Sequence, residues 1–324
     1  MPKVVRTSWH SLNPTWSSPQ PTSAFESHRP RQPSSQPIMT SEKEYTPQIR
    51  HYRPYFPPGV KRVIAHGGSA WIGEVNDSTV LKYPAAAGED VERLVAERTI
   101  LEAIPPHQHV IGYKGSIGEG IYLERVPNGT VSDYILDSGK PLSLAQRLAW
   151  CRETAEAVAW IHRHRVLHCD IQPSNLLLDE DLHIKLTDFQ GRLLAENGTT
   201  LVDGCSIEPY RFGLPRDDFR ADVKTDLFSL GSTIYFILMG HYIYPDIAAG
   251  EAGTWNKVEA RLRNNDWPRE HHICGAVTLK CWEQQYESAE EVVRDLEAIE
   301  RECTQSAAPD GLAGTEDEKA DDPQ

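Results

Sequence analysis

Three polar side chains lie near the ends of one short predicted hairpin. Asp170 stands in a polar loop, Asn175 follows it shortly before an apolar run, and Asp188 comes after the returning strand. The apolar run 176–178 and the alternating run 183–187 predict the two strands. We therefore expect two carboxylates and an amide to converge. Magnesium prefers such oxygen ligands, and a carboxylate can act as the base for a phosphoryl acceptor.

The order and spacing of these residues resemble the catalytic core of the eukaryotic protein kinase family. His168-Cys169-Asp170 stands where the family has His-Arg-Asp, Asn175 keeps the family spacing, and Asp188-Phe189-Gln190 stands where the family has Asp-Phe-Gly. One triplet alone would also fit an ordinary hairpin with acidic turns, whereas the ordered set is specific. The resemblance implies a catalytic base at Asp170 and magnesium ligands at Asn175 and Asp188. Several stretches, such as Lys224–Tyr235, look like the small kinases of filamentous fungi.

A lysine and a glutamate upstream fit the same resemblance. The run 79–82 predicts a strand ending in Lys82 and is similar to the family's Val-Ala-Ile-Lys strand. Apolar positions at helical spacing predict a helix over 89–104, which carries Glu97. The resemblance implies that Lys82 holds the α- and β-phosphates of ATP and that Glu97 fixes Lys82. The competing glutamates on this helix are Glu92 and Glu102.

The segment before that strand resembles the glycine-rich loop that covers the phosphates in the family. The run 65–72, Ala-His-Gly-Gly-Ser-Ala-Trp-Ile, follows a predicted strand at Val63-Ile64. Small residues let the backbone approach a phosphate closely. Taken alone, the pattern also fits a hairpin turn. The candidate nucleotide-binding residues in this loop are Ala65, Gly67, Gly68, Ala70 and Ile72.

Residues 121–126 resemble the hinge between the two lobes of the family fold. The resemblance implies that backbone groups of Glu124 and Val126 pair with adenine. Asp133, on a short predicted helix, is a candidate for binding the ribose, and a capping or surface role fits it equally well. The two further strands predicted around this point are 110–113 and 120–123.

The second half of the chain predicts a helical lobe. Ser143 opens a long helix, and Gln146 would complete a capping box. Thr225 is a candidate N-cap, and by resemblance Asp226 holds the backbone of the catalytic loop. Further helices are predicted near 252–264, 271–282 and 287–303. The expected fold is α+β and two-lobed, like a protein kinase, with a small lobe of β-sheet plus one helix and a larger, mainly α-helical lobe.

The length of 324 residues suits one two-lobed domain with tails, or two small domains. The Ser- and Pro-rich residues 1–58 and the acidic residues 304–324 predict disorder. The kinase-like domain is expected at 59–303, with the small lobe at about 59–124 and the large lobe at about 127–303.

Net charge and cysteine content limit the kinds of binding partner and the cellular compartment that we expect. A net charge of −14 argues against a nucleic-acid or anionic-membrane surface. The apolar run 227–239 is too short and too polar to span a membrane comfortably. Six scattered cysteines without a Cys-x-x-Cys motif fit reduced thiols in the cytoplasm or nucleus. The expected partner is a protein substrate, and the oligomeric state stays open.

Several residues depart from the family pattern. Cys169 replaces the Arg that receives an activation-loop phosphate, and Gln172 stands where Ser/Thr kinases have Lys. Gln190 replaces a glycine, which makes the backbone there stiffer. Leu214-Pro215-Arg216 stands where the family has Ala-Pro-Glu, and the late Arg that normally pairs with that Glu is also missing. Both halves of this buried pair are therefore missing together, which leaves no single buried charge without its partner.

The resemblance implies transfer of the ATP γ-phosphoryl group to a protein Ser/Thr hydroxyl, with Mg²⁺ and ATP as cofactors. The departures keep a second hypothesis open, namely a pseudokinase that acts as a nucleotide-binding or scaffold module. A third is a small-molecule kinase built on the same core. Fold alone does not decide among them.

Overall fold

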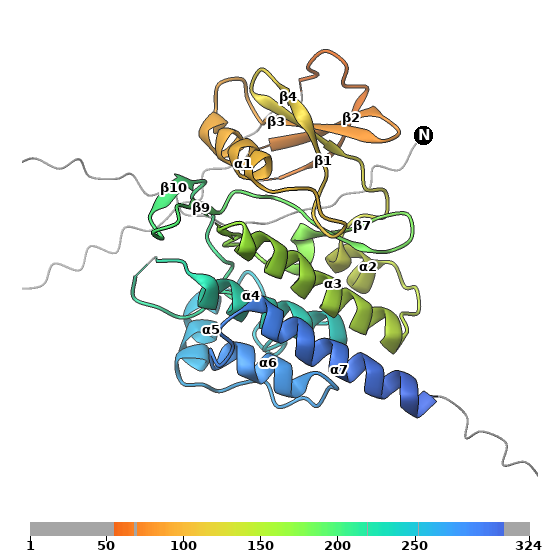
Figure 1. Cartoon of the computed structure of the whole chain (residues 1–324), viewed down its shortest axis with the longest axis vertical. Helices are drawn as coiled ribbons and strands as arrows, with labels where there is room; N and C mark the ends of the chain where they lie inside the picture. Colours follow the sequence, from red (N-terminus) through yellow and green to blue (C-terminus); the bar gives the residue numbers. More distant parts are fainter. Residues whose placement is uncertain (1–54, 68–69, 219, 252, 308–324) are drawn as a thin grey trace, which may run out of the picture.

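In the computed structural model, a small lobe of strands lies above a larger lobe of helices (Figure 1). This confirms the expected α+β, two-lobed architecture. The structure describes residues 55–307 except 68–69, 219 and 252. Most of the two tails predicted to be disordered lies outside the described residues, but residues 304–307 of the predicted C-terminal tail form the end of a helix instead.

The small lobe is a five-stranded antiparallel sheet in the order β1-β2-β3-β5-β4, with α1 packed against it (Figure 1). Buried apolar residues join the two layers, such as Leu123 on β5 and Ile100 on α1. Helix α1 ends at Ala103, directly before Ile104 and two prolines, as the sequence predicts. The elements are β1 (Arg62–His66), β2 (Ala70–Asn76), β3 (Thr79–Pro84), α1 (Val91–Ala103), β4 (Tyr113–Ile117) and β5 (Gly120–Glu124).

The large lobe is built around α3 and α4, and α4 is buried along most of its length. Two small sheets, β7-β8 and β10-β9-β6, lie between this core and the small lobe. The helices are α2 (Val131–Asp137), α3 (Leu144–Arg163), α4 (Val223–Met239), α5 (Thr254–Arg263), α6 (Gly275–Trp282) and α7 (Ala289–Ala307). The strands are β6 (Val166–Leu167), β7 (Leu176–Leu178), β8 (Ile184–Leu186), β9 (Arg192–Leu194) and β10 (Thr200–Asp203).

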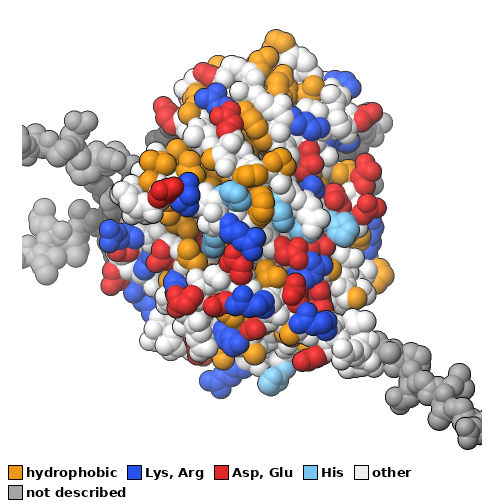
Figure 2. Space-filling model, in the orientation of Figure 1, with side chains coloured by type: hydrophobic (Ala, Val, Ile, Leu, Met, Phe, Trp, Pro, Cys, Tyr) orange, Lys and Arg blue, Asp and Glu red, His pale blue; other side chains and the backbone are white. Residues whose placement is uncertain are grey.

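Apolar packing, more than surface charge, joins α7 to the rest of the large lobe. Val292 and Leu296 of α7 are buried in the main core. Basic and acidic side chains alternate over the face drawn in Figure 2, and ion pairs such as Arg163 with Glu290, at 2.8 Å, link α3 to α7. Partly exposed pairs of this kind contribute at most about 1 kcal/mol each.

The strand predicted at 110–113 is wrong, because β4 begins only at Tyr113. Val110 and Ile111 are buried and lie beside β8 instead. The Ile111 N–H donates to the Leu186 carbonyl at 2.9 Å, and the Leu186 N–H donates to the His109 carbonyl at 2.9 Å. The apolar run therefore ties the small lobe to the hairpin β7-β8. A short run of apolar residues looks the same in the sequence whether it forms a strand or a buried connection.

Two helix caps also differ from the prediction. Asp222, not Thr225, is the N-cap of α4: its Oδ1 accepts from the Thr225 N–H at 3.1 Å, while Thr225 Oγ1 accepts from the Asp222 N–H at 3.2 Å. At α3, Ser143 Oγ accepts from the Gln146 N–H at 3.1 Å, as expected. The Gln146 side chain does not complete the box, because it donates to the Leu182 carbonyl at 3.4 Å.

Candidate active site

One lysine is shared by two carboxylates at the junction of the lobes. The Nζ atom of Lys82, on β3, lies 2.6 Å from Oε2 of Glu97 on α1 and 2.5 Å from Oδ1 of Asp188, which follows β8. Lys82 and Glu97 are buried, whereas 37% of the Asp188 side chain is exposed. The other two candidates on α1, Glu92 and Glu102, are exposed. Only Glu97, among these three glutamates, therefore faces the lysine.

Two side-chain amides hold the Asp170 carboxylate. Asn175 Nδ2 donates to Asp170 Oδ2 at 2.9 Å and to the Asp170 carbonyl at 2.8 Å. Gln172 Nε2 donates to Oδ1 at 2.6 Å. The short 3₁₀ turn Pro173–Asn175 brings the chain back so that Asn175 can reach Asp170. Sequence reasoning treated Gln172 only as a departure, although its place two residues after Asp170 was a signal for this contact.

Asp226 holds the backbone of the loop that precedes and carries Asp170, as expected. Its carboxylate is fully buried and accepts the N–H groups of His168 at 2.8 Å and of Cys169 at 2.9 Å. His162 Nε2 lies 2.9 Å from Asp226 Oδ2. Cys169 and Asp188 have φ values of 60° and 68°, in the left-handed region that costs non-glycine residues about 1–3 kcal/mol. Strain at two such residues indicates that the surrounding contacts impose this geometry.

Burial and charge shift the pKa values of the two aspartates in opposite directions. Burial and the nearby Asp188 carboxylate raise the pKa of Asp170 well above its usual range, and the two amides offset this only in part. Burial also acts to raise the pKa of Asp188, but the charge of Lys82 outweighs it and lowers that pKa. Asp170 is thus the more basic carboxylate, as a proton acceptor requires.

The lysine stays charged despite its burial. Burial acts to lower the pKa of Lys82, but the carboxylates of Asp188 and Glu97 outweigh it and raise the pKa above the ordinary value. A charged ammonium at this point can bind anionic phosphate oxygens.

The remaining oxygen atoms fit a divalent cation. Asn175 uses its N–H groups on Asp170, and its Oδ1 has no hydrogen-bond partner among the described residues; the same holds for Asp188 Oδ2. Two carboxylates, from Glu97 and Asp188, share the ammonium of Lys82, and the charge of Asp188 also acts on the Asp170 carboxylate. Oxygen donors with an excess of negative charge are what Mg²⁺ prefers.

The candidate glycine-rich loop joins β1 to β2 beside Lys82. Ala65 pairs with Ile72 across these strands, and Ile72 in turn pairs with Lys82 across β2 and β3. The Gly67 N–H donates to the Ala70 carbonyl at 2.8 Å, which closes the loop. The candidate Gly68 lies outside the described residues. The pairing therefore puts Ala65, Ile72 and Lys82 side by side on three adjacent strands.

The hinge residues differ in what they leave free for a ligand. The Glu124 N–H donates to the Gly112 carbonyl at 2.8 Å, and the Glu124 carboxylate accepts the Gly112 N–H at 2.8 Å. Val126 makes no backbone hydrogen bond to any other described residue. Asp133 is the third residue of α2, where its N–H donates to Oγ1 of the N-cap Thr130 at 3.0 Å. Val126 is thus the better placed of the two proposed adenine contacts.

An ion pair that sequence analysis missed holds the segment before α4. Arg216 Nη2 lies 2.9 and 3.2 Å from the two carboxylate oxygens of Glu208, whose side chain is 2% exposed. In the late region 281–286, which lacks the family's Arg, the carbonyls of Gln284 and Tyr286 accept hydrogen bonds from Lys224 Nζ at 2.9 Å and 2.7 Å. Both ends of the lost family pair are therefore stabilised by other charges. No periodic spacing in this turn-rich segment could have indicated the new pair.

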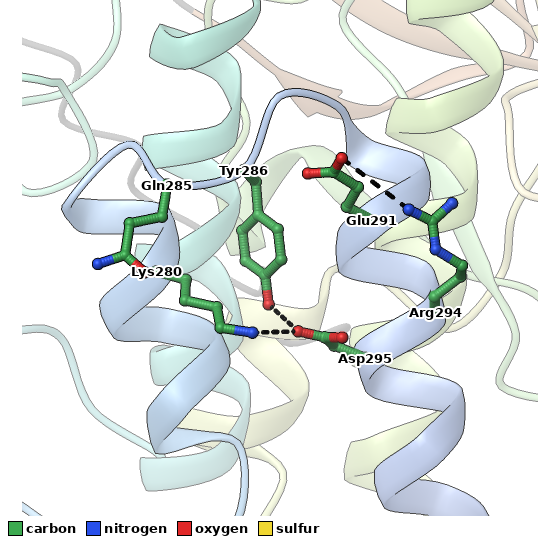
Figure 3. Close-up of a pocket in the computed structure, with 6 residues that line it drawn as sticks. All are labelled: Lys280, Gln285, Tyr286, Glu291, Arg294 and Asp295. Atoms are coloured by element: carbon green, nitrogen blue, oxygen red, sulfur yellow. Dashed lines mark hydrogen bonds and ion pairs between the residues drawn. The ribbon is translucent and has the colours of Figure 1, made fainter.

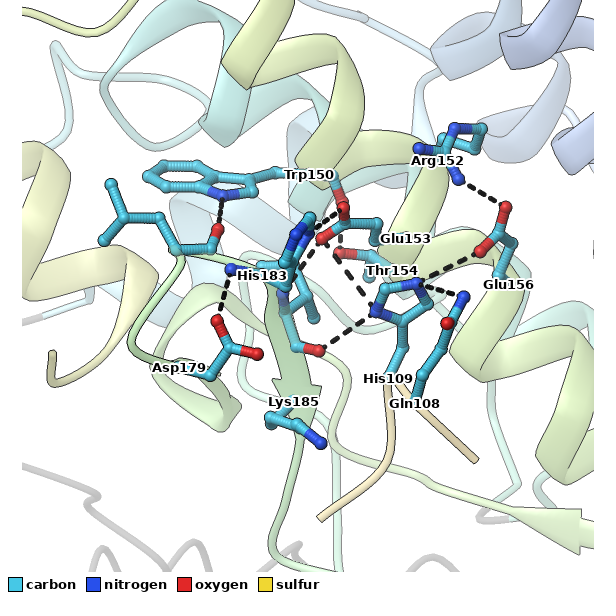
Figure 4. Close-up of polar contacts among 12 residues, drawn as sticks. Gln108, His109, Trp150, Arg152, Glu153, Thr154, Glu156, Asp179, His183 and Lys185 are labelled. Carbon is cyan, nitrogen blue, oxygen red and sulfur yellow. Dashed lines mark hydrogen bonds and ion pairs between the residues drawn. The ribbon is translucent and has the colours of Figure 1, made fainter. Parts of the chain in front are cut away.

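A partly buried polar network supports the hairpin β7-β8 from the side of α3 (Figure 4). Glu153 of α3 accepts from His183 Nδ1 at 2.7 Å and from the Ile184 N–H at 2.9 Å. His109, from the segment between α1 and β4, lies 3.2 Å from the Ile184 carbonyl and 3.3 Å from a Glu156 oxygen. The network therefore fixes β8, which leads directly to Asp188.

Stability near neutral pH is expected to depend on His183. The hydrogen bond to Glu153 and its charge raise the pKa of His183 in the folded protein. Its contribution is therefore fully present below the unfolded-state pKa of about 6.5 and is lost as the pH rises through the higher folded value. Urea unfolding of wild type and His183→Gln should show a stability difference that shrinks as the pH rises above about 6.5. A difference that does not change with pH would contradict this.

A shallow pocket between α6 and α7 is separate from this site (Figure 3). Its volume is about 310 Å³. The polar groups that line it bind one another: the Asp295 carboxylate lies 2.8 Å from Lys280 Nζ and accepts from the Tyr286 hydroxyl at 2.6 Å. We assign it no role in the chemistry, which lies between the lobes.

Comparison with known proteins identifies the class that this fold and site define. The family model for the protein kinase domain matches residues 77–305, and the chain belongs to the protein kinase family. That match begins after the loop at 65–72, so the glycine-rich loop is supported by the strand pairing rather than by the family match.

Individual relatives match this chain in part. Sucrose non-fermenting protein kinase 1 of Fusarium virguliforme is 30% identical over 146 residues, 43% of this chain and 20% of the relative. Carbon catabolite-derepressing protein kinase of Candida albicans is 32% identical over 165 residues, 48% and 25% of the two chains. Serine/threonine-protein kinase STY46 of Arabidopsis thaliana is 24% identical over 233 residues, 69% and 40%. The matches thus span two fifths or less of these relatives.

Proposed function

We propose that this protein kinase transfers the γ-phosphoryl group of ATP to a serine or threonine hydroxyl of a protein substrate and that it is catalytically active. The observation that carries the proposal is the sharing of Lys82 between Glu97 and Asp188, with Asp170 and Asn175 in contact beside them. Each of these five side chains has a separate task in phosphoryl transfer. The Ser/Thr preference is supported by one relative, from Arabidopsis thaliana, whose name states it.

Each residue is proposed for one task in positioning the reaction. Lys82, held by Glu97, binds phosphate oxygens. Asp188 and Asn175 supply oxygen ligands for Mg²⁺, which neutralises phosphate charge when bound. Asp170 orients the acceptor hydroxyl and takes its proton as the oxygen bonds to the γ-phosphorus and the bond to the ADP oxygen breaks. Catalysis of this kind is mainly positioning and charge stabilisation.

A nucleotide-binding scaffold without turnover is the second candidate, and one observation favours it. Gln172 occupies the position where Ser/Thr kinases have Lys, and its neutral amide contacts Asp170 at 2.6 Å. An amide offers hydrogen bonds to the transferring phosphate but no positive charge.

A transfer assay separates the two candidates. Purified full-length chain is incubated with Mg²⁺, labelled ATP and a generic protein substrate, beside Asp170→Ala. We expect label on serine or threonine after acid hydrolysis of the substrate with wild type only. Absence of transfer, together with thermal stabilisation by ATP and Mg²⁺, would support the scaffold. Absence of both would refute each of them.

The acid side of the pH profile is expected to depend on Gln172. Asp170 must be ionised to accept a proton, so kcat/KM falls as the pH drops below its raised pKa. Gln172→Leu removes a donor to the carboxylate and should move this fall to higher pH by about one unit. Gln172→Lys adds a cation and should move it to lower pH. Shifts in the same direction for both variants would contradict the role of Asp170 as the base.

We also propose the cytoplasm or nucleus as the compartment, a single kinase domain over about residues 59–303, and a protein substrate as the partner. All six cysteines are free thiols in the structure, which supports a reducing compartment. None of the helices in the described part of the chain combines the length and apolarity needed to cross a membrane.

A further inference from the structure

Gln190 joins the metal-binding end of the site to helix α1. It follows Asp188-Phe189, is 6% exposed, and its Nε2 donates to Glu97 Oε2 at 3.2 Å. The same oxygen lies 2.6 Å from Lys82 Nζ. The other oxygen, Glu97 Oε1, is buried and has no partner among the described residues. Lys82 and Gln190 are therefore the two described side chains whose polar contacts orient this carboxylate.

The backbone of Gln190 is fixed on both sides. A side chain on the next residue, Gly191, would overlap the carbonyls of Leu167 and His168, so only glycine allows this close contact with the catalytic loop. A side chain on Gly204 would overlap the Gln190 carbonyl, which also accepts the Ser206 N–H at 3.2 Å. Because the backbone cannot shift easily, the Gln190 amide is held at Glu97.

Glu97 needs a second hydrogen-bond donor because its first donor, the Lys82 ammonium, is shared with Asp188. Lys82 lies as close to Asp188, at 2.5 Å, as to Glu97, at 2.6 Å. Burial raises the pKa of Glu97, which shows that the buried charge is unfavourable unless donors stabilise it. Helix α1 also begins weakly, because its N-cap Asp90 has a φ of 51° and makes no side-chain capping bond. The position of α1 therefore depends on contacts farther along the helix, such as those of Glu97.

We propose that Gln190 is a positioning residue whose amide holds Glu97, and with it α1, in the arrangement that presents Lys82 to the nucleotide. This rests on the proposed kinase function. In the family pattern a glycine stands at this position and has no side chain for such a bond. The amide thus adds to the ordinary site a direct link across 93 positions of sequence, from the Asp-Phe-Gln segment to α1.

Two variants test the link without relying on catalysis alone. Gln190→Leu keeps the approximate volume but removes the donor, and Gln190→Asn keeps an amide that is one methylene too short to span the contact. Gln146→Leu makes the same chemical change on α3, where Gln146 contacts only the Leu182 carbonyl at 3.4 Å, and serves as the matched control.

Hydrogen exchange in full-length protein without nucleotide is the first readout. For both Gln190 variants, we expect the amides of α1, residues 91–103, to exchange about tenfold faster than in wild type, which corresponds to about 1.4 kcal/mol of local stability. Exchange in α3 and α4 should stay unchanged, as should all exchange in Gln146→Leu. Unchanged protection of α1, or equal loss of protection throughout the domain, would overturn the proposal.

Steady-state kinetics give the second readout. If Gln190 biases α1 toward its binding-competent position, its loss lowers the competent fraction, and saturating ATP restores it. KM for ATP should therefore rise several-fold, with kcat changed much less. A fall in kcat at constant KM would contradict this. If wild type transfers no phosphate, the proposed function fails, whereas the exchange experiment still decides whether Gln190 holds α1.

Discussion

Replacement of Asp188 by asparagine is expected to abolish phosphoryl transfer. The substitution keeps the shape of the side chain but removes the charge that lies 2.5 Å from Lys82 and the anionic oxygen available to a metal. A metal ligand of this kind contributes several kcal/mol to transition-state stabilisation, so kcat should fall by at least about a thousandfold. The measurement is label transfer from ATP at saturating Mg²⁺.

The matched control for Asp188→Asn is Asp181→Asn. Asp181 lies in the exposed turn of the same hairpin, between β7 and β8, and its side chain makes no hydrogen bond or ion pair among the described residues. Its activity should equal that of wild type. Removal of Mg²⁺ with a chelator should reproduce the loss seen with Asp188→Asn. Activity of Asp188→Asn within tenfold of wild type would show that Asp188 does not hold the metal.

Replacement of Asp226 by alanine is expected to give the largest loss of stability. The fully buried carboxylate accepts two backbone N–H groups and faces His162, and alanine leaves all three groups unpartnered inside the protein. Removal of one member of such a buried group costs about 3–5 kcal/mol. Transfer activity should also fall, because the loop that carries Asp170 loses its support. Urea unfolding monitored by fluorescence measures the first effect.

Asp246→Ala is the control for Asp226→Ala. Asp246 pairs with Arg261 at 2.5 Å, but 58% of its side chain is exposed and solvent screens the pair, so the loss of stability should be much smaller than for Asp226→Ala. A loss of less than about 1 kcal/mol for Asp226→Ala would mean that the catalytic loop holds its shape through other contacts.

The amino-acid sequence was enough to select the candidates for the principal site residues and to predict most of the elements that carry them. Asp170, Asn175 and Asp188 could be selected because they lie close together in the sequence, within one segment of fewer than 20 residues. Hairpin strands, helix periodicity and a proline-terminated helix depend on residues close in sequence. The sequence therefore predicted the hairpin β7-β8 and the helix that carries Glu97. It favoured Glu97 over Glu92 and Glu102, and the fold places Glu97 against Lys82.

Which side chains meet across long separations in the sequence depends on the folded structure. Gln190 and Glu97 are 93 positions apart, and Arg216 meets Glu208 within a segment that has no regular period. Val110 joins β8 although its apolar run predicted a strand, because burial against the large lobe satisfies the same pattern. Local propensity describes what a segment prefers. Packing then selects the partner, because a buried charge or amide needs whichever donor or acceptor the fold brings to it.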